Sequence, residues 1–366
     1  MCLYPRRIIN QKYIPNEKNK GNVPKPPIIG VDEFGGEIYD ERVLYVNVPC
    51  GQCIECRKQK ARNWQVRLHE EIKQHKHAYF ITLTFDPKEL EILCNRTGLN
   101  ECNAVAAYAV RHSLERYRKD YKKSLKHWYI TELGHEGTER IHLHGIIFCD
   151  HELEFVKSDK DHFYKWKYWK YGMVYVGDYC NAKTINYIVK YMNKIDNDHK
   201  GFVGQVLCSP GIGKAYTDKE RVKEMHRYRP GRTIDYYRLN NGAKIKLPAY
   251  WKNKCLNEDE REAKWRDFLD KDIESIMGTN YEPRTEGIEA LGRVRDKAQE
   301  VNIRSGYGDD SKQYRKVPWN ITKRMLQQVE RKRQMDKMAA AIRENNYELY
   351  KKIVKNDIFP GENLQD

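Results

Sequence analysis

Long apolar runs, an apolar leader and a nucleotide-binding P-loop are all missing from this sequence. No run approaches the roughly 20 apolar residues of a membrane-spanning helix, which excludes such a span. The opening residues 1–13 hold no apolar signal region, so we expect the chain to stay in a reducing cytoplasm. Gly211 and Lys214 lie too close together for a P-loop, and Ala215 follows the lysine, which excludes an ATP-driven motor.

Acidic residues are outnumbered by basic ones, and this imbalance limits the class of partner. The chain holds 52 Asp and Glu against 67 Lys and Arg, which gives a formal net charge of +15. Such an excess predicts attraction to a polyanion, most simply a nucleic acid. A basic but otherwise ordinary soluble protein is the alternative. The 26 tyrosines add stacking faces that suit single strands, although many of them must pack in the core.

Composition shifts divide the chain into five segments. An irregular arm comes first, followed by a cysteine cluster with a basic helix. A central domain precedes a hairpin and helical extension, and a flexible segment with a basic C-terminal helix comes last. The expected bounds are 1–49, 50–76, 77–216, 217–277 and 278–366.

Strand and helix patterns alternate through the central domain. Period-2 alternation and helical spacing predict strands at 77–86, 127–133, 140–148 and 173–178, and helices at 103–123 and 181–195. Gly134 and Gly137 lie between two of the strands and predict an antiparallel hairpin. This order favours an α+β fold with helices on an antiparallel sheet.

Three further elements are expected beyond the central domain. Asn241-Gly242 is typical of a tight hairpin turn. The polar, turn-rich residues 278–313 predict a flexible connection, and residues 320–356 predict a basic helix.

Two histidines on one predicted strand form a candidate metal site. Alternate residues of a strand point to the same face, so His142 and His144 project side by side and can chelate one divalent ion. The hairpin brings Glu132 across from them. A carboxylate with two imidazoles suits Mg²⁺ or Mn²⁺ and leaves positions open for a substrate. Glu136 and Glu139 are alternative carboxylates, and a structural role is the alternative for the histidines.

Two tyrosines and two lysines repeat at the spacing of one helical turn. Tyr187 and Tyr191 face the same way on the predicted helix, and Lys190 and Lys194 repeat the spacing. The plain interpretation is an amphipathic helix that packs its tyrosines in the core. The chemical interpretation is a pair of nucleophiles that act alternately on a phosphate polarised by the metal, with the lysines screening the developing charge.

The order of these motifs resembles a known superfamily. Residues 80–86 (FITLTFD), 141–145 (IHLHG) and 187–194 (YIVKYMNK) occur in the order of the three motifs of rolling-circle replication initiators, the HUH endonucleases. The sequence is most similar to the replication initiators of the Microviridae, within them the gokushovirus-like group. The resemblance also includes residues 1–13, 48–68 and 209–216 and spans roughly residues 1–216.

This resemblance implies a fold and a reaction. The fold is a ferredoxin-like antiparallel sheet with flanking helices, here with a helical C-terminal extension. The reaction nicks single-stranded DNA at a phage origin and transfers the strand through a 5′-phosphotyrosine, followed by a ligase-like second transfer. A host helicase and polymerase in the bacterial cytoplasm would act with it, without a membrane.

The resemblance also implies roles for single residues. Thr82, Thr84 and Asp86 fall in the first motif, which builds the sheet edge beside the DNA. The two histidines of the second motif would hold the metal, and the tyrosines of the third would be nucleophiles. Lys190 and Lys194 would assist phosphate binding. The glutamate ligand has no tight spacing rule in the superfamily, so Glu132 rests on the hairpin alone.

Closely spaced cysteines precede the first basic helix. Cys50, Cys53 and Cys56 are good zinc ligands, and Cys2 is the first candidate for a fourth, with His69 or His75 as alternatives. Unbound thiols and an iron–sulfur cluster remain open as alternatives to structural zinc. The helix that follows either lies along phosphates or presents a solvated basic face; its cationic residues are Arg57, Lys58, Lys60, Arg62 and Arg67.

Three functions compete at this point. The first is a metal-dependent DNA endonuclease and strand transferase. The second is a non-catalytic, zinc-stabilised DNA-binding protein, and the third is a metal-dependent hydrolase that uses water. Only the first predicts a covalent protein–DNA adduct through Tyr187 and Tyr191.

Overall fold

The computed structural model describes residues 1–135, 139–158, 162–199, 201–309 and 318–326, together with 340, 342 and 344. The chain forms two units, each assembled from segments that are distant in the sequence. Unit 1 comprises residues 1–78, 180–203 and 208–317, and unit 2 comprises 79–179, 204–207 and 318–366. The predicted central domain, 77–216, contributes to both units, and its domain boundaries stay a prediction.

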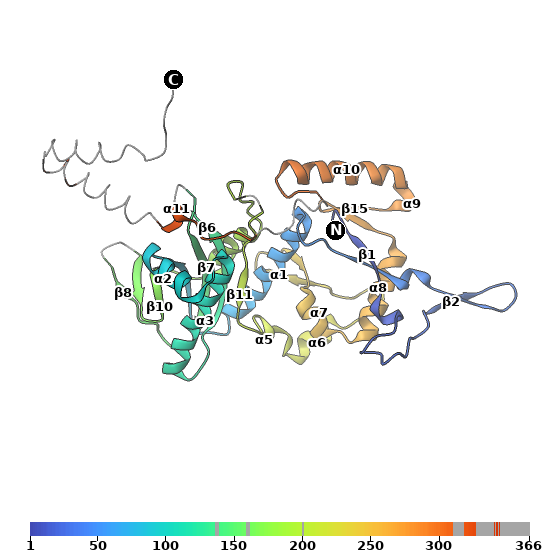
Figure 1. Ribbon diagram of the computed structural model, residues 1–366. Coiled ribbons are helices and arrows are strands. Elements are labelled where there is room, and N and C mark those ends of the chain that lie inside the picture. The colour runs from blue at the N-terminus through green and yellow to red at the C-terminus, as the bar shows by residue number, and fades with distance from the viewer. Residues whose placement is uncertain are drawn as a thin grey trace, which may run out of the picture. The chain divides into compact units, whose positions relative to one another are not determined.

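Unit 2 is built on a seven-stranded sheet (Figure 1). The strand order is β11-β6-β7-β5-β10-β9-β8. The pairs β6–β7, β5–β10, β10–β9 and β9–β8 are antiparallel. The strands are β5 (His77–Thr84), β6 (Lys126–Leu133), β7 (Ile141–Cys149), β8 (Val156–Lys157), β9 (Phe163–Trp166), β10 (Trp169–Val176) and β11 (Val206–Cys208).

Two helices connect β5 to β6, and β7 lies between these two strands in the sheet. Asp86 begins α2 (Pro87–Thr97) by accepting a hydrogen bond from the Lys88 amide, and Glu101 caps α3 (Cys102–Tyr121) in the same way. The Asp86 carboxylate thus serves as a helix cap. This connection forms a split β-α-β arrangement.

The α3 helix covers one face of the sheet. Thr131 of β6 donates a hydrogen bond to Asn103 of α3 (2.5 Å), and Thr131 is paired with Leu143 of β7. Leu143 is fully buried. Because strand side chains alternate, the neighbouring residues His142 and His144 point to the opposite face.

Unit 1 is organised around α1 (Ile54–Ile72). Val66 of α1 packs in a buried cluster with Tyr237, Ile245, Leu247 and Trp251. These residues come from β12 (Tyr236–Arg238), β13 (Lys244–Lys246) and α7 (Ala249–Cys255), or lie next to them. The β12–β13 pair confirms the predicted Asn241-Gly242 hairpin, whose glycine has φ +83°. The tyrosine helix α4 (Ala182–Ile188) and the 3-10 turn η3 (Val189–Met192) also contact α1.

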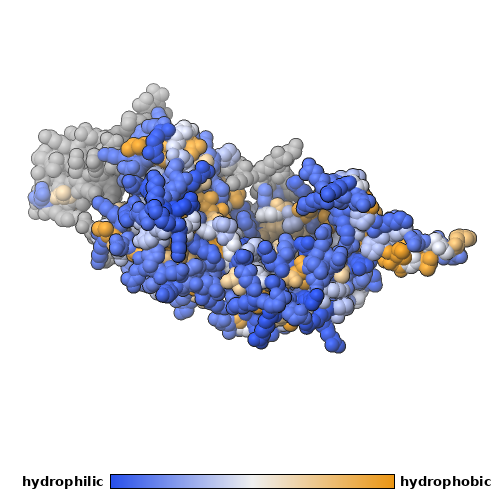
Figure 2. Space-filling model, turned by 90° about the horizontal axis from the view of Figure 1, so that it is seen from below, coloured by the Kyte–Doolittle hydropathy of each residue, from blue (hydrophilic) through white to orange (hydrophobic). Residues whose placement is uncertain are grey.

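The N-terminal arm and the segment after residue 277 are more regular than their composition predicts. Strand β1 pairs with β4, and β2 pairs with β3 as a hairpin with exposed apolar side chains, visible as orange atoms in Figure 2. The remaining elements are η1 (Gln11–Tyr13), η2 (Glu41–Leu44), β1 (Arg6–Ile9), β2 (Ile28–Val31), β3 (Glu37–Tyr39), β4 (Tyr45–Val48), α5 (Lys214–Thr217), α6 (Glu220–His226), α8 (Glu258–Lys271), β14 (Glu274–Ile276), β15 (Thr279–Tyr281), α9 (Pro283–Glu286), α10 (Ile288–Arg304) and α11 (Lys323–Leu326).

The 17-residue helix α10 corrects the expected flexible connection at 278–313. Its Leu291, Ala298 and Asn302 are buried, so an apolar stripe that is sparse in the sequence still suffices for packing. Most of the predicted helix at 320–356 lies outside the described residues.

The α+β class and the antiparallel sheet are confirmed. Within the described part of the chain, no helix has the length and apolar character needed to cross a bilayer.

Candidate functional site

Glu132, His142 and His144 converge on the sheet face opposite α3. The strand register pairs Glu132 with His142 and Ile130 with His144. The Nε2 atoms of His142 and His144 lie 3.2 Å and 2.9 Å from the same carboxylate oxygen, Oε2 of Glu132. All three side chains are largely buried, with exposed fractions between 12% and 21%. The potential ligand atoms lie within 4.8 Å of one another, as one metal ion requires.

The outer nitrogen of each ring has a partner of its own. His142 Nδ1 lies 3.2 Å from the Arg140 carbonyl oxygen, and His144 Nδ1 lies 2.9 Å from Oγ1 of Thr82. Partners of this kind orient metal-binding imidazoles and set their tautomers. Thr82, from the first motif, therefore supports the second motif directly.

The carbonyl partner of His142 has a chemical consequence. A carbonyl oxygen only accepts, so Nδ1 of His142 carries the proton that it donates. In the neutral ring Nε2 is then an acceptor, and it faces a carboxylate oxygen at 3.2 Å. Two acceptors in contact require a cation between them or a second proton on the ring. The donor set therefore fits a bound divalent ion.

Two residues beside the histidines carry the geometry without being predicted. Arg140 donates from Nη1 to the Phe85 carbonyl oxygen (2.9 Å), and burial lowers the pKa of its guanidinium. Gly145 lies so close to β6 that a Cβ atom would be 2.5 Å from the Trp128 carbonyl oxygen. A glycine inside a strand signals such a close approach, and this signal was present in the IHLHG motif.

The two tyrosines lie at the surface of unit 1. Their hydroxyl oxygens are 2.6 Å apart, and their rings are perpendicular with centroids 5.4 Å apart. Tyr187 is 48% exposed. The core side of the same segment consists of other residues: Ile185, Ile188, Val189 and Met192. The expectation of tyrosines packed in a core is therefore wrong for Tyr187, the more exposed of the pair.

The helix that carries the tyrosines is shorter than predicted. Asn181 and Thr184 form the capping box at its start, as the sequence indicated. The α-helix ends at Ile188, and Tyr191 stands in the 3-10 turn that follows. Lys190 and Lys194 are both exposed, and Nζ of Lys194 lies 6.0 Å from the centroid of the Tyr191 ring.

The basic residues of α1 divide into two groups. Lys60 and Arg62 are exposed. Arg57 and Arg67 donate to the carbonyl oxygens of Gln52 and Ile212, respectively, and burial lowers the pKa of both guanidinium groups. Arg67 also lies over the rings of two aromatic side chains, Trp64 and Tyr250. Lys58 is half-buried. DNA binding by all five residues stays a prediction.

The four cysteines also come together. Their sulfur atoms lie within 4.8 Å of one another in unit 1, and Cys2 completes the group. The alternative fourth ligands, His69 and His75, are not part of this group. All four cysteines are reduced and lie partly or fully buried.

Fold and site together define an α+β protein with a two-histidine, one-carboxylate centre on an antiparallel sheet. Residues 78–196 match the family model of the replication-associated protein ORF2. This match includes the histidine pair and the tyrosine pair.

Two viral proteins are similar over a longer stretch. The replication-associated protein ORF2 of Spiroplasma virus 4 is 26% identical over 215 residues, which covers 50% of this chain and 62% of that relative. The replication-associated protein VP4 of Bdellovibrio phage phiMH2K is 22% identical over 248 residues, which covers 63% of this chain and 75% of the relative. No solved structure matches this chain. The resemblance to phage replication initiators that the motifs indicated is thereby confirmed.

Proposed function

We propose that this chain initiates rolling-circle replication by nicking single-stranded DNA at a phage origin and transferring the strand through a 5′-phosphotyrosine. The observation that carries the proposal is the convergence of both imidazoles on Glu132. The surface pair of hydrogen-bonded phenols, Tyr187 and Tyr191, supplies the nucleophiles. Both groups fall inside residues 78–196, the part that matches a replication-associated family.

The strand order supports an HUH-type, ferredoxin-like core. The four strands β6-β7-β5-β10 have the order expected when the first and third strands are central neighbours. Helices α2 and α3 form the first crossover. The link from β7 to β10 differs from the simple pattern, because its described residues contain the strands β8 and β9 in place of a helix.

Glu132, His142 and His144 would hold Mg²⁺ or Mn²⁺. The ion would polarise the scissile phosphate and reduce its negative charge. The chain's own residues orient that centre: Thr82 and the Arg140 carbonyl fix the rings, and the largely buried position of all three ligands limits competing water.

The phenols perform the covalent chemistry. A phenol oxygen attacks phosphorus, the bond from phosphorus to the 3′ oxygen breaks, and the released strand gains a 3′ hydroxyl. The phenol proton leaves through solvent to the 3′ oxygen, so the step needs no external cofactor energy. Lys190 and Lys194 are exposed next to the phenols in sequence and would hold the phosphate. The second phenol would attack in the later transfer that closes the circle.

The partners follow from this reaction. The 3′ hydroxyl would prime a host polymerase, and a host helicase would open the duplex, since the chain has no P-loop. These events would take place in the bacterial cytoplasm.

A covalent adduct tests the proposal. The full chain is incubated with single-stranded origin oligonucleotides and Mn²⁺, and the products are separated on a denaturing gel. We expect a protein–DNA adduct that persists in part in Tyr187→Phe and in Tyr191→Phe and disappears in the double variant. His142→Ala with His144→Ala should also abolish it.

The other outcomes distinguish the competing functions. Full adduct in the double tyrosine variant would refute the assignment of the nucleophiles. Metal-dependent cleavage without an adduct would identify a hydrolase that uses water. DNA binding with neither product would identify a non-catalytic binding protein.

A further inference from the structure

Four cysteine sulfurs in unit 1 approach the dimensions of a tetrahedral metal site. The Sγ atoms of Cys50 and Cys56 are 3.9 Å apart, and those of Cys53 and Cys2 are 4.0 Å apart. Zinc–thiolate bonds of about 2.3 Å in a tetrahedron give sulfur separations of about 3.8 Å. A disulfide would bring two sulfurs to about 2.05 Å. The spacing therefore fits four ligands around one ion.

The backbone around the cysteines is shaped to present their sulfurs. Gly51 has φ +78°, a left-handed conformation that turns the chain directly after Cys50. The amide of Cys53 donates to Sγ of Cys50 (3.4 Å), and the amide of Cys50 donates to Sγ of Cys2 (3.2 Å). Amide donors stabilise negative charge on sulfur, and metal-binding sulfur is the thiolate.

The first turn of α1 supplies the remaining ligand. Cys53 is the N-cap residue of α1, and Cys56 lies three residues later on the same side of the helix. The carbonyl of Cys53 accepts from the amide of Arg57, so this turn is a regular part of the helix. Two of the four ligands are thus fixed by helix geometry.

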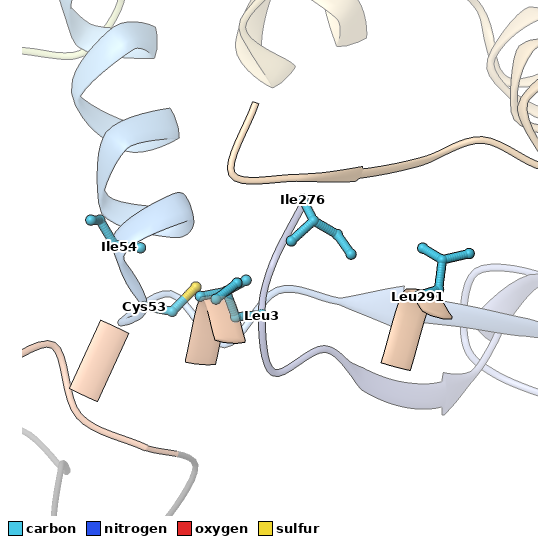
Figure 3. Packing of buried hydrophobic residues seen from close by; sticks show 6 residues of the cluster. Leu3, Cys53, Ile54, Ile276 and Leu291 are labelled. Atoms are coloured by element: carbon cyan, nitrogen blue, oxygen red, sulfur yellow. The ribbon is translucent and has the colours of Figure 1, made fainter. Parts of the chain in front are cut away.

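An apolar cluster surrounds the cysteines. Cys53 packs with Leu3, Ile54, Ile276 and Leu291, which Figure 3 shows lying around its sulfur on four separate segments. The other three cysteines pack against this cluster. These segments are the N-terminus, α1, β14 and α10, so the site lies where distant parts of unit 1 meet.

We propose that Cys2, Cys50, Cys53 and Cys56 bind one structural zinc ion that fastens the N-terminal segment to α1. Thiolates are soft ligands and select zinc over Mg²⁺ or Mn²⁺. Four protein ligands leave no position for a substrate, which makes the site structural. A cluster of several irons would spread its thiolates farther apart than a single ion does, so the observed sulfur separations favour zinc.

Zinc here would act on folding. Cys2 and Cys50 are separated by 48 positions in the sequence, and joining them through a metal removes the freedom of a long loop from the unfolded chain. Because the complete ligand set exists only in the folded protein, the free energy of zinc binding adds to the free energy of unfolding. This role is independent of the nicking reaction.

Metal analysis of the purified full chain tests the proposal. After a wash with EDTA, we expect about one zinc per chain by mass spectrometry of the metal content. Cys53→Ser and Cys56→Ser should lose it. Cys94→Ser, a half-buried cysteine on α2, is the matched control and should keep it. His142→Ala with His144→Ala should keep it as well, which separates this ion from the catalytic one.

A second measurement guards against variants that fail to fold. Cys2→Ser leaves three ligands and the rest of the chain intact, and Cys2→His restores a fourth ligand. Loaded with Co²⁺, the wild-type chain and Cys2→His should show the intense visible absorption of a tetrahedral site, and Cys2→Ser should show a weaker, shifted spectrum. Chelation of zinc should lower the melting temperature of wild type and leave Cys2→Ser less affected.

Three results would overturn the proposal. The first is folded wild-type protein without zinc after the EDTA wash. The second is iron together with labile sulfide in place of zinc. The third is full zinc content in a Cys50→Ser, Cys53→Ser double variant. Each can occur whether or not the DNA adduct forms, so the two proposals fail separately.

Discussion

Thr82 and Thr84 have the same chemistry and point to the same face of β5, yet their hydroxyls have different partners. The Thr82 hydroxyl contacts Nδ1 of His144 at 2.9 Å, whereas the Thr84 hydroxyl donates to the Met173 carbonyl oxygen at 2.8 Å. The first contact orients a proposed metal ligand, and the second joins β5 to β10. The pair therefore separates support of the metal from support of the sheet.

Thr82→Val should weaken Mn²⁺ binding by about 10–100-fold, the usual effect of removing a hydrogen-bond partner from a metal-binding imidazole. Thr84→Val is the control and should leave the affinity near that of wild type. The measurement is the Mn²⁺ concentration that gives half-maximal adduct formation, supported by direct Mn²⁺ binding. Equal affinities in the two variants would contradict the orienting role of Thr82.

Lys252 should make stability depend on pH. Burial lowers the pKa of its amine from 10.5 to about 8, and Lys246 and Lys264 lower it further, while Asp235 opposes them. Below pH 8 the folded protein must hold a charged amine in a buried position, which costs about 3 kcal/mol. Between pH 8 and 10.5 the folded state loses this proton before the unfolded state does, so the stability contributed by this group rises with pH.

Lys252→Met should therefore unfold at higher urea than wild type at pH 7, and this advantage should shrink toward pH 10. Lys254→Met, an exposed position on the same helix, should change the free energy of unfolding by less than about 0.5 kcal/mol. An advantage of Lys252→Met that stays constant with pH would show that the amine is not the cause.

Side chains in a motif were predictable, and their supports were not. Strand alternation alone predicts that His142 and His144 share a face, and a hairpin predicts that Glu132 lies opposite them. The Arg140 carbonyl has no sequence signal, because every residue has a carbonyl group. The exposure of Tyr187 was likewise hidden, since helical spacing gives a shared face without telling which face is outside.

At the scale of elements, β6 and β7 approach each other too closely for a side chain at one position. A Cβ atom on Gly145 would lie 2.0 Å from Cδ1 of Tyr129 and 2.5 Å from the Trp128 carbonyl oxygen. In contrast, a Cβ atom on Gly292 of α10 would meet no atom within 4 Å. The same substitution should therefore have opposite effects in these two elements.

Gly145→Ala should lower the free energy of unfolding by about 1–3 kcal/mol or more, because the backbone atom cannot move aside. Gly292→Ala should raise it by about 0.5–1 kcal/mol, since alanine favours the helix interior. Thermal unfolding of both variants beside wild type gives the comparison. A Gly145→Ala variant as stable as wild type would show that β6 and β7 can separate at this point.

Regular elements with strong periodicity could be predicted, and their ends could not. The β6–β7 hairpin and α1 match their expected spans within a few residues. The tyrosine helix changes to a 3-10 turn after Ile188, although the helical pattern continues in the sequence. Packing of η3 against α1 offers the physical reason, because tertiary contacts override a weak local preference.

At the scale of the whole molecule, sequence-distant segments form each unit, and local patterns carry no record of that. Cys2 and Leu3 meet α10 only because the chain returns to its beginning after residue 270. A composition shift can mark a polar segment, but it cannot tell that α10 will find a buried surface there. The net charge of +15, however, is a property of the whole chain that sequence gives directly.

That charge should make binding to single-stranded DNA strongly dependent on salt. Each phosphate neutralised by a cation contributes about −0.7 to the slope of log affinity against log salt for a single strand. If exposed Lys60 and Arg62 of α1 contact phosphates, Lys60→Gln with Arg62→Gln should reduce the slope by about 1.4. Titrations of a fluorescent oligonucleotide at several salt concentrations give the slope.

The control must change the net charge without touching α1. Lys18→Gln with Lys20→Gln removes two positive charges from exposed positions of the N-terminal arm. Both double variants lower the formal charge equally, so general attraction predicts equal effects on the slope. A contact surface on α1 predicts a smaller slope only for the α1 variant, because counterions are released where cation and phosphate meet. Equal slopes in the two variants would assign the binding to net charge and remove α1 from the DNA interface.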